Sequence, residues 1–183
     1  SLNSPGIGSM GFGVPSALGA CVASGRKRVI CTNGDGGFQL NIQELETIRR
    51  LNLPIKFFVL NNDGYGSIKT TQRNYFGGLF VGSDSSSGVT LPDTIKIAKA
   101  YGFRAFHLDK TASLKQTIKK ILNSKGPAIC EVMIDPMETV VPKVSSAVGS
   151  DGKMFSKPLE DLYPFLPRPE FQKNMIIEPL KEN

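Results

Sequence analysis

The sequence has 183 residues, of which 40% are apolar and 21% are charged, with a net charge of +6 and a pI of about 9.3. This composition is typical of a folded globular chain and excludes a disordered polypeptide; no apolar run reaches the ~18 residues that a membrane span needs. The length indicates one main domain with a core large enough to need no disulfide bonds.

The excess of basic residues does not indicate a nucleic-acid interface. Lys and Arg are spread along the chain rather than gathered on one element with interleaved aromatic residues, and Trp is absent. The three cysteines, Cys21, Cys31 and Cys130, form no C-x-x-C motif. We therefore expect reduced thiols, a cytoplasmic location without a signal peptide, and neither nucleic acid nor membrane as a partner.

The chain begins with a glycine-rich segment, 1–13, which is followed by a predicted helix of small residues over 14–24. The spacing Gly6-x-Gly8-x-x-Gly11 resembles a dinucleotide-binding motif, but that motif must follow a strand, and nothing strand-like precedes it here. The next stretch, 28–33, is nearly continuous in apolar character and rich in β-branched residues. We expect it to be a strand buried on both faces.

Residues 38–52 place apolar side chains at helical spacing, and 55–60 have the character of a second strand buried on both faces. Strand, helix and strand make a βαβ unit, whose two parallel strands end at the same edge of the sheet. Asp35 follows the first strand, and Asn61 and Asn62 follow the second. We expect them to lie side by side, where open α/β sheets bind ligands.

The residue types at this edge indicate a magnesium–diphosphate site. The Asp35 carboxylate, an Asn amide oxygen and backbone carbonyls are hard oxygen donors, which Mg²⁺ binds together with phosphates. Gly36 and Gly37 lack side chains and begin a helix, so their N–H groups can approach a phosphate closely. The alternative interpretation of Asn61 and Asn62 is an Asx-turn that ends a strand.

The rest of the chain completes an α/β pattern. A helix is expected to begin over 67–72, and the Gly- and Ser-rich segment 73–88 is expected to be either a lid or a simple surface loop. Helices are predicted over 92–101 and 112–125, and strands over 103–108 and 127–134. His107, the only histidine, receives no functional role. The predicted fold class is α/β, doubly wound, with a mostly parallel sheet and helices on both faces.

Composition changes near residue 140, which separates a predicted α/β domain, 1–140, from a C-terminal tail, 141–183. The tail holds six of the 12 prolines and shows little periodicity. We expect it to be extended and to pack on the domain or on a neighbouring subunit.

The sequence resembles the thiamine diphosphate (ThDP) enzymes, whose signature is Gly-Asp-Gly followed at a set distance by Asn-Asn. Here Gly34-Asp35-Gly36 is followed by 24 residues, 37–60, and then by Asn61-Asn62. Segments 6–20 and 126–136 look like the corresponding segments of the acetolactate synthase branch. The chain thus resembles the C-terminal ThDP-binding domain of the catalytic large subunit of acetolactate synthase.

The resemblance implies ThDP and Mg²⁺ as cofactors. The metal ligands would be the side chains of Asp35 and Asn62 and the backbone carbonyl of Gly64, and Met10 would support the bent cofactor. The implied cofactor-binding residues are Gly8, Ser9, Met10, Gly34, Asp35, Gly36, Gly37, Asn62, Gly64, Tyr65 and Gly66. No catalytic residue is implied in this chain, because the family's catalytic glutamate lies in another domain, normally of another subunit.

The implied activity is decarboxylation and carboligation of pyruvate or a related 2-oxo acid, as a transferase or lyase, in branched-chain amino acid biosynthesis. Other domains of a parent chain and a second subunit, in a dimer or tetramer, would be partners, and the isolated fragment would be inactive. FAD, if the parent uses it, would not be bound here. Acetolactate synthases typically carry Met and Trp where this chain has Ser67 and Thr71.

That departure leaves two alternatives open. One is a different ThDP enzyme, such as an oxo-acid decarboxylase or a carbon–carbon hydrolase of sugar or cyclitol metabolism. The other is a non-catalytic ThDP-binding module.

Overall fold

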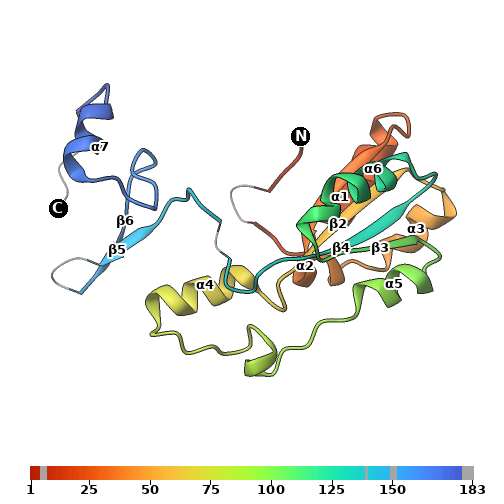
Figure 1. The fold of residues 1–183 in the computed structure, drawn as a ribbon, viewed down its shortest axis with the longest axis horizontal. Helices are drawn as coiled ribbons and strands as arrows, with labels where there is room; N and C mark the ends of the chain where they lie inside the picture. Colours follow the sequence, from red (N-terminus) through yellow and green to blue (C-terminus); the bar gives the residue numbers. More distant parts are fainter. Residues whose placement is uncertain (5–7, 139, 149–151, 179–183) are drawn as a thin grey trace. The chain divides into compact units, whose positions relative to one another are not determined.

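The computed structural model describes residues 1–4, 8–138, 140–148 and 152–178, and it divides into two compact units, Ser1–Glu138 and Thr139–Asn183. The first unit is built on a parallel sheet of four strands in the order β1-β2-β4-β3 (Figure 1). These strands are β1 (Val29–Gly34), β2 (Ile55–Asn61), β3 (Arg104–Leu108) and β4 (Ala128–Met133). The predicted α/β class with a parallel sheet is confirmed.

The strand register brings the ends of the two predicted motifs together. Gly34 pairs with Leu60, and Asn61 pairs with Met133, so β1, β2 and β4 finish at one edge of the sheet. Asp35 and Asn62 come directly after β1 and β2 and therefore lie at that edge.

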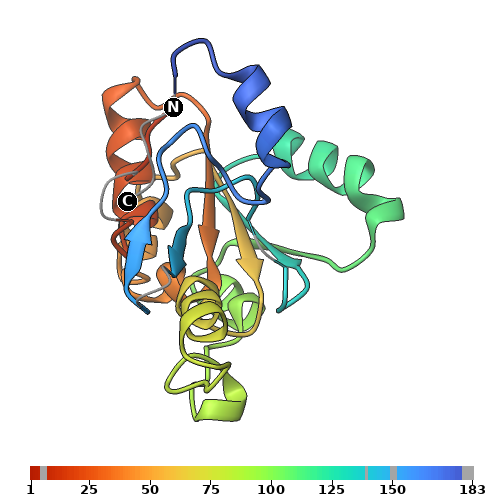
Figure 2. The ribbon, with the colours of Figure 1, turned by 90° about the vertical axis from the view of Figure 1, so that its left-hand side faces the viewer.

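Helices cover both faces of the sheet, as predicted. One face carries α1 (Gly13–Ala23), α2 (Asp35–Gln39), α3 (Glu44–Arg50) and α5 (Thr94–Ala100), whose apolar side chains share a core with β2. On the other face α6 (Leu114–Asn123) buries Ile121 against Leu108 and Cys130. Figure 2 shows the sheet between α1 and α6. The remaining helix of this unit, α4 (Gly66–Tyr75), follows the Asn61-Asn62 motif.

Two expectations for the βαβ unit are wrong. The strand over 28–33 is an edge strand rather than one buried on both faces, and Ile30 on it is 55% exposed. The helix over 38–52 is interrupted between α2 and α3. The interruption falls at Asn41, whose side-chain Nδ2 donates to the Gly11 carbonyl at 2.8 Å. Asn has a low helix propensity, and at position 41 its side chain is bound to a carbonyl 30 positions earlier in the chain, outside the helix.

The second unit is more regular than the extended tail that its composition predicts. A hairpin pairs β5 (Ser146–Val148) with β6 (Met154–Ser156), and a helix, α7 (Arg168–Asn174), follows. The Arg168 guanidinium donates to both carboxylate oxygens of Asp161, at 2.8 and 2.9 Å, and lies 4.7 Å from the Phe171 ring centroid. This bidentate pair and its aromatic contact give the unit a small local core.

Within the described parts of the chain, no helix is long and apolar enough to cross a membrane.

Candidate functional site

Asp35 joins the two sequence motifs. It lies at the first turn of α2, where the residue is 7% exposed, and its Oδ1 accepts the Gly36 N–H at 2.7 Å. Its Oδ2 accepts the N–H groups of Asn62, at 3.2 Å, and of Gly64, at 3.3 Å. The carboxylate after β1 is therefore bound directly to the turn after β2, as the βαβ geometry predicts.

Burial raises the pKa of the Asp35 carboxyl, and hydrogen bonds from the Gly36, Gly64 and Asn62 N–H groups only partly oppose that rise. Keeping Asp35 ionised thus costs free energy, because the buried carboxylate has little contact with water. A cation bound beside it would offset that cost, because an opposite charge favours the ionised form. The electrostatics of Asp35 therefore suit a metal ligand.

The turn that faces Asp35 can be made only with glycine at its end. Gly64 has φ +143, and a Cβ there would lie 2.3 Å from the carbonyl oxygen of Ser83. The Gly64 carbonyl accepts the Gly66 N–H at 3.1 Å. A carbonyl oxygen has two lone pairs, so it keeps a position for a second interaction. The Asn62 amide lies beside Gly66, with its Nδ2 2.3 Å from the site of a Gly66 Cβ.

Met10, Gly36 and Tyr65 form a second contact group next to Asp35. A Cβ built on Gly36 would lie 2.5 Å from the Tyr65 ring and 3.3 Å from the Met10 methyl carbon. Gln39 on α2 donates from Nε2 to the Tyr65 hydroxyl at 3.3 Å. Three chain segments that are far apart in the sequence thus meet at one glycine.

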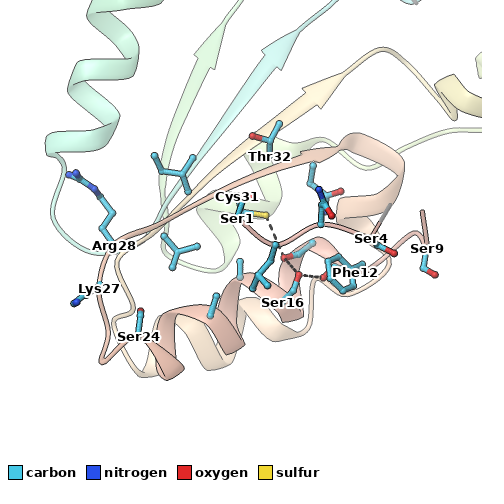
Figure 3. Close-up of a pocket in the computed structure, with 18 of the residues that line it drawn as sticks. Ser1, Ser4, Ser9, Phe12, Ser16, Ser24, Lys27, Arg28, Cys31 and Thr32 are labelled. Atoms are coloured by element: carbon cyan, nitrogen blue, oxygen red, sulfur yellow. Dashed lines mark hydrogen bonds between the residues drawn. The ribbon is translucent and has the colours of Figure 1, made fainter. Parts of the chain in front are cut away.

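Not every predicted residue joins this group. Gly8 and Ser9 line a groove of about 750 Å³ together with residues of α1 and β1, and Asp35 is not among the residues that line it. Figure 3 shows Lys27 and Arg28 at one end of this groove and Ser4, Ser9 and Phe12 at the other. Gly6 and Ile7, which belong to the same predicted segment, lie outside the described residues.

The donor set at Asp35 fits a magnesium–diphosphate group. One carboxylate, one amide and one carbonyl are hard oxygen ligands, and Mg²⁺ is normally completed by phosphates and water. Of the three glycines here, only Gly34 has open space at its Cβ position. Tyr65 and Met10 lie at that of Gly36 and Asn33 at that of Gly37, and the Gly36 N–H is already donated to Asp35. Among the described residues no group of three or more His, Cys, Asp or Glu could hold a metal, so a metal here would also need amide, carbonyl, phosphate or water oxygens.

A buried ion pair beside the turn was not predicted from the sequence. Lys69 on α4 contacts Asp84, with Nζ 3.1 Å from Oδ2 and both side chains buried. Residues 83–88 are tied to the turn, because the Tyr65 N–H donates to the Ser83 carbonyl at 2.8 Å and Gly64 pairs with Asp84 in a β-bridge. The end of the predicted lid or loop is therefore fixed, whereas Phe76, Leu79 and Val81 before it are exposed.

Residues 1–132 match the family model described as the thiamine pyrophosphate enzyme, C-terminal TPP binding domain, where thiamine pyrophosphate is another name for ThDP. The chain belongs to this family of ThDP-binding domains, which confirms the resemblance seen in the Gly-Asp-Gly and Asn-Asn motifs.

Within that family its relatives include acetolactate synthases. It is 36% identical over 159 residues to the isozyme 2 large subunit of Escherichia coli K12, which is 85% of this chain and 28% of that protein. It is 37% identical over 149 residues to acetolactate synthase 2, chloroplastic, of Zea mays, covering 79% of this chain and 23% of the relative. The large subunit of Cyanidium caldarium is 33% identical over 144 residues, covering 79% and 24%. The chain spans about a quarter of the length of these relatives.

Proposed function

We propose that this chain holds the diphosphate of ThDP through Mg²⁺, as the cofactor domain of an acetolactate synthase-type enzyme that acts on pyruvate or a related 2-oxo acid. The observation that carries the proposal is the direct link between the buried Asp35 carboxylate and the turn at Asn62 and Gly64. It occurs in a chain whose family binds ThDP and whose relatives include acetolactate synthases.

Each site residue has a distinct role in this proposal. Asp35 and Asn62 bind the metal through side-chain oxygens, and Gly64 binds it through its carbonyl. Gly34, Gly36, Gly37 and Gly66 let the backbone pass close to the diphosphate, because none of them carries a Cβ. Gly8, Ser9, Met10 and Tyr65 contact the rest of the cofactor. When bound, ThDP supplies the nucleophilic carbon and the electron sink that decarboxylation of a 2-oxo acid requires.

The remaining machinery belongs to other parts of a larger assembly. The chain covers about a quarter of its relatives, so the catalytic glutamate, the other domains and a second subunit of a dimer or tetramer complete the proposed active site. The chain alone binds the cofactor without turnover. The parent acts as a transferase or lyase of branched-chain amino acid synthesis in the cytoplasm, and any FAD is bound outside this domain.

The first test is the melting temperature of the chain with ThDP, with Mg²⁺, and with both. Ligand at about 100 times its dissociation constant adds ~2.7 kcal/mol, or roughly 5 to 10 °C for a domain of this size. We expect this rise only with both ligands and no rise in Asp35→Asn. Asp109→Asn, which removes an exposed carboxylate after β3, should keep the full rise. A wild-type chain that does not respond to the two ligands together would contradict the proposal.

The residues at α4 favour a second candidate function. Ser67 and Thr71 are exposed, and the Thr71 hydroxyl donates to the Ser67 carbonyl at 3.1 Å. Both side chains are smaller and more polar than the Met and Trp of acetolactate synthases. The alternative is therefore a different ThDP enzyme, either a decarboxylase or a carbon–carbon hydrolase. Product analysis of the parent enzyme with pyruvate distinguishes the two, because only an acetolactate synthase forms acetolactate as the main product.

A further inference from the structure

Three polar side chains from three neighbouring strands meet at the carboxyl edge of the sheet, next to the proposed site. Glu131 on β4 is 9% exposed. Its Oε1 accepts the Asn61 Nδ2 hydrogen at 2.8 Å, and its Oε2 lies 3.0 Å from Nδ1 of His107 on β3. No local pattern connects these residues, since His107 and Glu131 are 24 positions apart.

Glu131 determines which way the Asn61 amide faces. An ionised carboxylate only accepts hydrogen bonds, so the NH₂ group of Asn61 must point toward it. The amide oxygen of Asn61 then faces the turn, where it accepts the Asp63 N–H at 3.0 Å. The Asn61 backbone is held as well, because its carbonyl accepts the Ile134 N–H at 3.0 Å.

The turn that Asn61 holds is the one that binds Asp35. Asp63 has φ +56, a left-handed conformation that a side-chain hydrogen bond to its N–H helps to maintain. This conformation lets Asn62 and Gly64, on either side of Asp63, both direct their N–H groups to one oxygen of Asp35. The contacts therefore run without a gap from His107 to Asp35.

We infer that Glu131 is a positioning residue of the cofactor site: through Asn61 it fixes the turn over 61–64, which orients Asp35 and presents Asn62 and the Gly64 carbonyl, while His107 holds Glu131 in place. The inference rests on the proposed function for its ligand. Burying a carboxylate is costly even when it is paired, so a purely structural contact at this position would be served better by an apolar residue.

The test compares three variants of the full chain with the wild type. Glu131→Ala removes both hydrogen bonds. Glu131→Gln keeps an oxygen that can accept a hydrogen bond from Asn61. The NH₂ group of the new side chain can donate to a neutral His107. Ile129→Val, two residues earlier on β4, removes one buried methyl group and serves as the control for lost stability.

Two measurements distinguish an effect on the turn and on cofactor binding from a general loss of stability. The first is hydrogen exchange of the Asn62 and Gly64 amides in the chain without ligands, and the second is the dissociation constant for ThDP at saturating Mg²⁺. In Glu131→Ala we expect both amides to lose about tenfold in protection and ThDP to bind about tenfold more weakly, each corresponding to ~1.4 kcal/mol. Glu131→Gln and Ile129→Val should stay near the wild type in both, although Ile129→Val melts at a lower temperature.

Wild-type protection and affinity in Glu131→Ala would overturn the inference, and so would a Glu131→Gln variant as impaired as Glu131→Ala. If the wild-type chain binds no ThDP with Mg²⁺, the proposed function fails. The exchange of the two amides still decides whether Glu131 orients the turn, because that measurement needs no ligand.

Discussion

The Tyr65 ring lies against Gly36, with two ring carbons 2.5 Å from the position that a Cβ on residue 36 would take. The Met10 methyl carbon lies 3.3 Å from the same position. The last glycine of the Gly-Asp-Gly motif is therefore needed for packing within the protein, whether or not a ligand is bound. It is the point at which the glycine-rich start of the chain, the first motif and the turn after the second motif meet.

Gly36→Ala should consequently destabilise the chain without any ligand present. The new methyl group must displace the Tyr65 ring, and overpacking of this kind costs about 1 to 3 kcal/mol. Gly34→Ala is the matched control, since Gly34 is extended and has no atom within 4 Å of its Cβ position; its change should stay within about 0.5 kcal/mol. Urea denaturation of the three proteins measures the difference, and equal losses would show that the Tyr65 contact is not tight.

The ion pair between Lys69 and Asp84 predicts a loss of stability in acid. Hydrogen bonds from Ser86 and the Lys69 ammonium bring the pKa of Asp84 down to about 2, whereas an unfolded Asp has a pKa of about 3.9. Below pH 4 the unfolded chain therefore binds a proton that the folded chain does not. The stability that Asp84 contributes is complete above its unfolded pKa and declines as the pH falls from about 4 to about 2.

This decline should be absent in Asp84→Asn. The variant cannot titrate at residue 84, so its stability should fall less between pH 4 and pH 2 than that of the wild type, although it starts lower. The melting temperature of each protein is measured as a function of pH. Other carboxylates titrate equally in both proteins, so the difference between the two pH profiles isolates the contribution of Asp84. Parallel curves over this range would contradict the assignment of the lowered pKa to Asp84.

Lys56 predicts a stability effect far from the cofactor site. It is 1% exposed near the start of β2, and its ammonium donates to the Ser124 carbonyl at 2.7 Å, the Ser124 hydroxyl at 2.9 Å and the Gly126 carbonyl at 2.5 Å. These groups follow the end of α6, and Lys56→Met would leave them without their partner. We expect a loss of about 2 to 3 kcal/mol, from the cost of removing hydrogen bonds to a charged group.

The control is Lys96→Met, which removes an exposed lysine of α5 and should change the free energy of unfolding by less than about 0.5 kcal/mol. Both variants should bind ThDP and Mg²⁺ as the wild type does below their melting temperatures, because neither side chain contacts Asp35 or its turn. A loss of affinity in Lys56→Met alone would show that the two ends of β2 are coupled.

What could be predicted from the sequence is what depends on local pattern and parallel topology. The apolar runs before Asp35 and Asn61 define strands, and a right-handed βαβ connection brings their ends together whatever the neighbouring strands are. The position of Asp35 beside Asn62 and Gly64 therefore needed no knowledge of the whole sheet.

The rest depends on strand order and on pairs that are distant in sequence. Ile30 has the same apolar character as its neighbours in β2, and only the order of the strands makes it an edge residue. Lys56 and Glu131 also lie in strands that read as apolar, and their partners, Ser124 and Asn61, are 68 and 70 positions away. No local periodicity signals such pairs.

The same substitution at two glycines of α1 should have opposite effects. Gly13 begins the helix, and a Cβ there would lie 2.6 Å from Nδ2 of Asn33, whose amide also lies 2.9 Å from the Cβ position of Gly37. Gly13→Ala must therefore push Asn33 toward the Gly-Asp-Gly loop, and we expect it to cost about 1 to 3 kcal/mol. Gly19 is exposed in the same helix with nothing within 4 Å, so Gly19→Ala should add about 0.5 to 1 kcal/mol through helix propensity. Urea denaturation without ligand measures the change in the free energy of unfolding of each variant. A Gly13→Ala variant as stable as Gly19→Ala would mean that Asn33 can move aside freely.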